Sequence, residues 1–216
     1  MSIRGDRKEQ TVRNILDAAA REFAETGFEG ARMDRIADSA GANKAMIYYH
    51  IGDKQVLYSR VLHEVLGHTA ARMAENIQAA DTPREKLRAY VRSVGKTVTE
   101  HPYMPRIMMR EMASGGRALP DIAIGDFAAI IGMVGNVIQL GVRSGEFAEL
   151  DPFVLHLMVI GGLSYGRAAA SVMARYPEEA AALVGGEDVA NMSSLLNKVE
   201  TIVLAALAGH RHKDLP

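Results

Sequence analysis

The side chains best suited to contact a partner lie on two short predicted helices, at about residues 33–39 and 43–50, and at the start of the next helix. Ile47 is expected to face inward, so the opposite face of the second helix carries small, aromatic and basic groups. Such groups can approach base edges and thymine methyls, while His50 and Lys54 can reach phosphates. Tyr49 could instead pack in the core. The candidate DNA contacts are Asn43, Lys44, Ala45, Tyr48, Tyr49, His50 and Lys54.

The turn between these two helices has residues typical of a helix-turn-helix. Gly41 suits the turn because glycine adopts positive φ without strain, and Asn43 can cap the second helix. Ile47 and Ile51 lie about one turn apart and can hold that helix to the core. In a helix-turn-helix, the first helix crosses the phosphate backbone while the second enters the major groove. The spacing therefore favours a DNA-binding unit.

The histidines do not form a metal site by spacing. His63 and His68 resemble a zinc-protease motif, but their separation of five residues is about 140° around a helix, so they cannot share one ion. Glu64 and His68 are four residues apart and can pair. No Ser/His/Asp arrangement or phosphate-binding loop can be assembled, and the absence of Cys excludes thiolate chemistry. We expect no catalytic residue, no metal and no cofactor.

A methionine cluster predicts a small-molecule pocket. Met104, Met108 and Met112 recur every fourth residue, and methionine adapts to apolar ligands of several shapes. Plain core packing is the alternative. Asn136 and Gln139 could orient a polar group of the ligand, or could lie on a solvated edge. The candidate ligand contacts are Tyr90, Tyr103, Met104, Met108, Met112, Phe127, Met133 and Tyr165.

The last predicted helix carries a narrow apolar seam with spacings of three and four residues. Such a seam suits a partner helix in a homodimer. Packing within the chain is the alternative. The candidate interface residues are Val189, Met192, Leu196, Val199 and Val203.

Helical spacing of apolar residues dominates the whole chain, and the alternation typical of strands is scarce. Glycines, prolines and caps divide it into about nine helices, the last of them ending near Gly209. Thr82–Glu85 is a capping box with proline at the first helical position, and Tyr176 precedes Pro177 at the end of the eighth helix. The fold class is all-α.

Composition sets limits on the partners. The chain has 216 residues, with 25 Lys and Arg against 26 Asp and Glu, no Cys and no Trp. A net charge of −1 means that a DNA-binding surface must be local. The longest apolar tract, residues 153–163, is shorter than the roughly 20 residues of a membrane helix, and the N-terminus lacks a signal peptide. We expect a cytoplasmic protein without a membrane partner.

Residues 10–60 resemble the DNA-binding domain of TetR-family transcriptional regulators. The resemblance rests on Ile36-Ala37, Ala40-Gly41, Asn43-Lys44, Ile47-Tyr48-Tyr49-His50-Ile51, Asp53-Lys54 and Leu57. It implies a three-helix helix-turn-helix domain at residues 1–55 and a larger helical domain at residues 56–216 that binds a ligand and dimerises. It also favours the homodimer interpretation of the last helix.

Arg32 departs from the family pattern. The family commonly has Ser or Thr at this position, capping the next helix, and loss of such a cap costs about 1 kcal/mol. Arg32 could instead contact a phosphate, so it joins the candidate DNA contacts.

These observations together predict a ligand-responsive repressor. A homodimer would bind a palindromic operator of double-stranded DNA, and a hydrophobic small molecule would release it. The rival interpretation is a helical small-molecule-binding protein or enzyme without a role on DNA.

Overall fold

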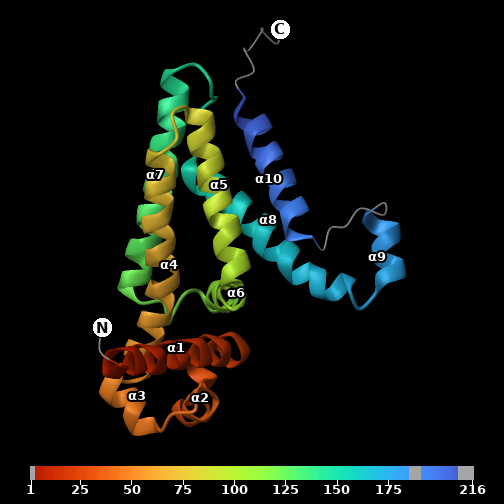
Figure 1. Ribbon diagram of the computed structural model, residues 1–216. Coiled ribbons are helices and arrows are strands. Elements are labelled where there is room, and N and C mark those ends of the chain that lie inside the picture. Colours follow the sequence, from red (N-terminus) through yellow and green to blue (C-terminus); the bar gives the residue numbers. More distant parts are fainter. Residues whose placement is uncertain (1–2, 185–190, 209–216) are drawn as a thin grey trace. The chain divides into compact units, whose positions relative to one another are not determined.

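The computed structural model describes residues 3–184 and 191–208, and over these residues the chain forms ten helices and one isolated antiparallel bridge between Phe147 and Ala208 (Figure 1). The all-α prediction is confirmed. The helices are α1 (Ile3–Gly30), α2 (Met33–Ala40), α3 (Lys44–His50), α4 (Lys54–Gln78), α5 (Pro83–Glu100), α6 (Met104–Ser114), α7 (Asp121–Arg143), α8 (Pro152–Met173), α9 (Pro177–Val184) and α10 (Met192–Leu207).

Helix α9 is the element that the sequence interpretation missed. Pro177 was expected only to end the preceding helix, but it begins a new one at its first position. Proline is well suited there because its missing N–H would have no partner in the first turn anyway. Glu178 and Glu179 follow in that first turn, where acidic side chains interact favourably with the helix dipole.

The helices group into two compact units. The first comprises the chain up to His68 together with His101–Asp126, and the second comprises Thr69–Glu100 and the chain from Phe127 onward. Helices α4 and α7 each run through a boundary without a break. The division thus differs from the expected one at residue 55, because α6 packs on α1 and folds with the N-terminal helices.

The first unit has a core of aliphatic and aromatic side chains. Phe23 of α1 packs edge-on against Tyr58 of α4, with ring centroids 4.7 Å apart. Gly27, at φ 74° and ψ 174°, interrupts α1 near its end. The fully buried residues of this core include Ile15, Ala19, Phe23, Ile36, Ile47, Leu57, Leu62 and Ile107.

The second unit is built around α5, α8 and α10, which pack against one another. Its core combines Val91, Val134, Val159 and other aliphatic side chains. Gly95 allows α10 to approach α5 closely, because a Cβ there would lie 2.6 Å from a methyl of Leu196. Small residues at such crossings set the distance between helices.

The seam of the last helix packs on this core, and its use as a homodimer interface stays a prediction. Val203 is buried, and Met192, Leu196 and Val199 are half-buried and pack against the core of their own chain. Val189 lies outside the described residues. Packing within the chain therefore covers Val203 and part of the surface of the other three side chains.

Ionic contacts also attach α10 to α5. The carboxylate of Glu200 is buried and accepts hydrogen bonds from Nε of Arg88 and Nε of Arg92, both at 2.9 Å. Two charged donors on one carboxylate satisfy its oxygens, as a buried charge requires. The three side chains therefore define the register between the two helices.

Tyr90 and His156 form a buried polar pair inside the second unit. The Tyr90 hydroxyl lies 2.9 Å from Nδ1 of His156. Burial raises the pKa of Tyr90 and lowers the pKa of His156. Both groups are therefore held neutral near neutral pH, in keeping with their apolar surroundings.

Two helices, α7 and α8, are long and apolar enough to cross a membrane when judged by length and composition alone. The expectation that no apolar segment reaches that length is therefore wrong. One side of each helix packs in the core of the second unit. Val137 and Ile138 of α7 and Leu155 and Val159 of α8 are buried there. The outward side of α8 is also apolar, so it requires an explanation.

Replacing Glu200 with Gln should lower the free energy of unfolding by about 1–3 kcal/mol, because both arginines lose a charged acceptor. Urea denaturation of the full chain measures the change. Glu149→Gln, at an exposed position, is the control and should be close to neutral. Equal stability of Glu200→Gln and the control would show that the cluster does not stabilise the contact between α5 and α10.

The free energy of unfolding should decrease as the pH falls, because His156 is harder to protonate in the folded chain than in the unfolded chain. Because its folded pKa is lowered, the unfolded chain binds more protons at this histidine below about pH 6.5. The contribution is complete above that value and is lost as the pH falls toward the folded pKa. Urea denaturation at about pH 7.5 and about pH 5.5 should show a smaller loss in His156→Gln than in the wild type. His68→Gln, at an exposed position, should keep the wild-type loss.

Candidate nucleic-acid interface

The turn between α2 and α3 is short and is held by backbone hydrogen bonds and a helix cap. Gly41 adopts φ 63° and ψ 31°, and its N–H bonds to carbonyls of the last turn of α2. The next N–H, of Ala42, bonds to the Ala37 carbonyl at 3.0 Å. Asn43 then caps α3, its side chain accepting a hydrogen bond from the Met46 N–H at 2.8 Å. The roles predicted for Gly41 and Asn43 are confirmed.

Helix α3 presents one apolar and one exposed face. Ile47 is fully buried, while Tyr48 is 49% and Tyr49 84% exposed. Ala45 is exposed beside them. The core alternative for Tyr49 is therefore excluded in this structure. Two phenol groups on a short helix, with a small residue one turn before them, leave room for close approach to base edges.

The basic residues near α3 differ in how firmly they are held. Lys44 pairs with Asp34 at 3.0 Å, and both side chains are largely exposed. Such a pair is weak, so Lys44 can exchange its partner for a phosphate. Lys54 is more enclosed: its ammonium donates to the carbonyls of Glu29 and Ala31 and lies 4.7 Å from the ring centroid of Phe28. A DNA contact at Lys54 stays a prediction.

His50 is half-buried, and its Nδ1 is buried without a hydrogen-bond partner in the structure. Its ring packs edge-on against Tyr49, with centroids 4.9 Å apart. A phosphate contact at His50 also stays a prediction. The packing shows a further role, because the His50 ring supports the base of the most exposed tyrosine.

The residue before α2 is held by a side chain that sequence reasoning did not identify. Arg32 is the N-cap residue but makes no side-chain cap. Its backbone N–H instead donates to Oε1 of Glu22 of α1, at 3.3 Å, and Arg35 lies 3.5 Å from the other oxygen of the same buried carboxylate. Glu22 thus holds the N-cap residue in place, whereas a Ser or Thr cap would accept an N–H of the first turn of α2 itself. The contact with Glu22 leaves the Arg32 side chain exposed and able to meet a phosphate.

The histidines of α4 make ordinary pairs. His68 lies 3.7 Å from Glu64, as the spacing predicted, and Nδ1 of His63 lies 2.8 Å from Asp126. Among the described residues, no group of three or more metal-binding side chains comes together.

The expected ligand contacts are divided between the two compact units. Tyr103, Met104, Met108 and Met112 belong to the first unit, and Tyr90, Phe127, Met133 and Tyr165 to the second. Met104 and Tyr90 are buried, whereas Met112 is 61% and Tyr165 73% exposed. The Tyr103 hydroxyl accepts a hydrogen bond from Arg21 at 3.1 Å. Asn136 and Gln139 are exposed, which fits their interpretation as a solvated edge.

Helix α6, which carries the methionines, is attached to the N-terminal helices by polar contacts. Arg110 donates to the carbonyls of Ala24 and Glu25 near the end of α1, at 3.0 and 2.6 Å. The buried Tyr58 hydroxyl of α4 donates to Glu111 at 2.6 Å. Burial and the adjacent carboxylate raise the pKa of Tyr58, so it remains the proton donor of this pair.

Comparison with known proteins agrees with this geometry. Residues 15–61 match the family described as bacterial regulatory proteins, tetR family, and residues 62–207 match the YcdC-like protein C-terminal region. The transcriptional regulator RutR of Escherichia coli K12 is 31% identical over 145 residues, which cover 67% of this chain and 68% of RutR. The transcriptional repressor NicS of Pseudomonas putida KT2440 is 29% identical over 174 residues, covering 76% and 78%.

Solved structures show the same fold. A transcriptional regulator from Saccharomonospora viridis in complex with choline has a TM-score of 0.69 at 16% sequence identity, with 94% of this chain and 100% of that chain covered. The family models together span most of the chain and join a DNA-binding module to a helical module. Because proteins of this family regulate transcription and are not enzymes, the enzyme alternative is set aside. The chain belongs to the TetR family and is a helix-turn-helix, DNA-binding transcriptional regulator.

Proposed function

We propose that this protein is a homodimeric repressor in the cytoplasm that binds a palindromic operator and leaves it when a small molecule binds. The observation that carries the proposal is the exposed pair Tyr48 and Tyr49 on α3, opposite the buried Ile47. A helix of seven residues is only about 10 Å long, so one copy reads a few base pairs. A second copy doubles the contact and explains a two-fold operator.

The outward face of α8 supports a dimer. Phe153, Leu157 and Tyr165 are all at least half exposed, while Leu155 and Val159 on the opposite side are buried. An apolar face of this length is unfavourable in water and marks an interaction surface. A Cβ at Gly161, in the middle of this face, would meet no atom within 4 Å, so the backbone is open to close approach. We place the homodimer interface on this face of α8, and a contribution from the seam of α10 stays a prediction.

The contacts of α6 suggest how the two functions are linked. Its hydrogen bonds from Arg110 to α1 and from Tyr58 to Glu111 attach it to the DNA-binding helices. Along the chain, α6 directly follows α5, which belongs to the second unit. A ligand that shifts α5 would therefore pull on the helices that hold α3. Release requires that the ligand bind one of the two conformations more tightly.

Support for repression and for a small effector comes from relatives. NicS is named a repressor, and the Saccharomonospora viridis regulator was crystallised with choline. A hydrophobic effector stays a prediction from the methionine cluster.

The DNA contacts can be tested with DNA from upstream of the protein's own coding region. Tyr48→Ala and Tyr49→Ala should each weaken specific binding about tenfold or more, because each base contact contributes about 1–3 kcal/mol. Gel shifts with specific and unrelated DNA measure the effect, which should be absent on the unrelated DNA. Tyr176→Ala, another exposed tyrosine, is the matched control. If Tyr48→Ala and Tyr49→Ala bind like the control, α3 does not read bases through its tyrosines.

The α8 interface can be tested by sedimentation velocity. Leu157→Glu combined with Tyr165→Glu should give a folded monomer, because the new charges would be buried unpaired between the two copies. Ile124→Glu, at an exposed apolar position on α7, should remain dimeric. Leu196→Glu should instead destabilise the chain, since Leu196 packs on the core. A dimer in the α8 double variant would exclude this interface.

A further inference from the structure

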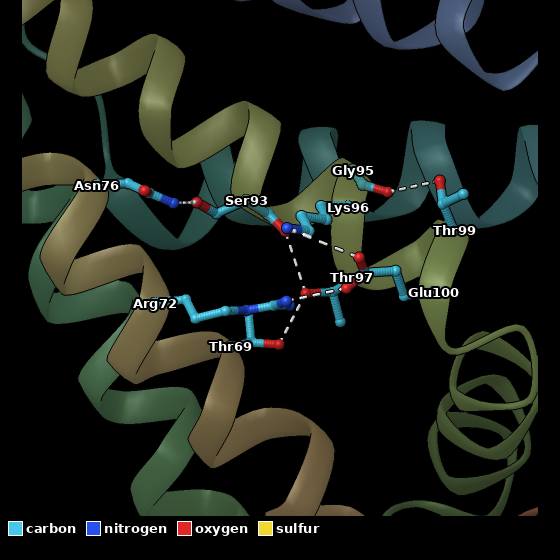
Figure 2. Close-up of polar contacts among 9 residues, drawn as sticks. All are labelled: Thr69, Arg72, Asn76, Ser93, Gly95, Lys96, Thr97, Thr99 and Glu100. Carbon is cyan, nitrogen blue, oxygen red and sulfur yellow. Dashed lines mark hydrogen bonds and ion pairs between the residues drawn. The ribbon is translucent and has the colours of Figure 1, made fainter.

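The second unit contains a polar cleft between α4 and α5. It has a volume of about 130 Å³ and is lined by Thr69, Arg72, Glu75, Asn76, Ser93 and Lys96. All six side chains are polar or charged, although both helices use their other sides for apolar packing in the same unit, through Met73 of α4 and Val94 of α5. Figure 2 shows five of them, all except Glu75, pointing toward one another from the two helices. A polar cavity of this kind can hold a polar molecule.

The inner wall of the cleft is built from buried hydroxyl groups. The hydroxyls of Thr69 and Thr97 lie 2.7 Å apart, and the Asn76 amide donates to the Ser93 hydroxyl at 3.2 Å (Figure 2). Thr69, Ser93 and Thr97 are all buried. These cross-helix hydrogen bonds fix the positions of donors and acceptors on the wall. A wall of preorganised polar groups favours a ligand that can hydrogen-bond along its length.

Two cations meet one carboxylate beside the cleft. Nη1 of Arg72 lies 2.9 Å from Oε2 of Glu100, and Nζ of Lys96 lies 3.7 Å from Oε1 of the same residue (Figure 2). All three side chains are partly exposed, so solvent weakens both ion pairs. Arg72 carries five N–H donors and uses one nitrogen for Glu100. The two cations that line the cleft therefore already bind a carboxylate beside it, that of Glu100, which they can exchange for another.

We propose that this cleft binds a small organic carboxylate, whose anionic group takes the place of Glu100 between Arg72 and Lys96. The body of the molecule lies along Asn76 and Ser93. An apolar cavity of about 150 Å³ holds benzene, so the volume here fits a single ring or a short chain. Arg72 and Lys96 outnumber Glu75 among the charged lining residues, which favours an anion here. The hydrophobic effector predicted from the methionines is the alternative ligand.

The position of the cleft gives the ligand a route to the DNA-binding helices. Arg72 and Asn76 lie on α4, and the same helix continues without a break into the first unit, where Tyr58 bonds to Glu111. A carboxylate that draws Arg72 away from Glu100 changes the contact between α4 and α5. That this ligand is the effector rests on the function proposed above, whereas its binding to the cleft does not.

Binding is tested on the full chain without DNA, using benzoate, propionate and succinate as probes and the corresponding amides as neutral controls at equal ionic strength. At about ten times its Kd, a carboxylate should raise the Tm by about 3–6 °C, and its amide should not. Arg72→Gln and Lys96→Gln should abolish the shift. Arg84→Gln, an exposed arginine of α5 outside the cleft, should retain it.

Glu100→Gln supplies the sharper test. It removes the competing carboxylate while keeping a side chain of the same size, so the probe that binds the wild type should bind several times more tightly in calorimetry. The proposal is overturned if no probe gives a shift that its amide lacks, if Arg72→Gln keeps the full shift, or if Glu100→Gln weakens binding.

A gel shift with the upstream DNA separates the cleft from the effector role. If the probe binds but does not affect the DNA complex, the cleft is a carboxylate site but not the effector site. If the wild type does not bind this DNA, only the proposed function is contradicted. The calorimetry tests carboxylate binding to the cleft without DNA.

Discussion

The carboxylate of Glu22 lies buried at the N-terminus of α2, where it accepts the Arg32 N–H and pairs with Arg35. A buried charge is tolerated only when donors surround it, so this contact fixes the start of α2 against α1. The orientation of α2 then determines where Gly41 turns the chain and where α3 begins. The exposed Tyr48 and Tyr49 therefore depend on a residue that lies on a different helix. A carboxylate near the first turn of α2 also interacts favourably with the positive end of the helix dipole.

Similar polar contacts between helices recur through the molecule. Tyr58 with Glu111 joins α4 to α6, Thr69 with Thr97 joins α4 to α5, and Tyr90 with His156 joins α5 to α8. Apolar packing alone would permit several registers between such helices, whereas a buried hydrogen bond permits one. Each such hydrogen bond is either formed or broken. In a regulator, these bonds can therefore distinguish two arrangements of the helices that they join. The cleft between α4 and α5 lies beside one of them.

The charges are arranged locally, which reconciles a near-neutral chain with DNA binding. Arg32, Arg35 and Lys44 lie on or beside α2 and α3. The acidic partners of Arg35 and Lys44, which are Glu22 and Asp34, lie in the same unit. Lys44 and Asp34 are both exposed, so a phosphate can compete with Asp34 for the ammonium. Glu22 cannot be displaced in this way, since it is buried. The ion pair with Glu22 therefore holds Arg35 in place, and it involves no side chain of α3.

The sequence by itself determined the features that span a few residues. Gly41 and Asn43 form the turn and cap that their types predict, and Asp151 caps α8 through the Val154 N–H. The capping box is also present, with Thr82 and Glu85 bonding each other's backbone N–H. Such signals are readable because both partners lie within one helical turn. The family resemblance extended this from local motifs to the fold class and DNA binding.

The tertiary structure decided what depends on distant residues. The spacing of Leu196, Val199 and Val203 fits a partner helix and a core equally well, and only the position of α5 and α8 shows that they face their own core. Glu22 binds the N-cap residue of α2 from ten residues away, and the cleft unites side chains of α4 with side chains of α5. Sequence periodicity reports which face of a helix is apolar, but not what covers that face. Long-range packing supplies that information, because the same apolar stripe is stable against any complementary surface.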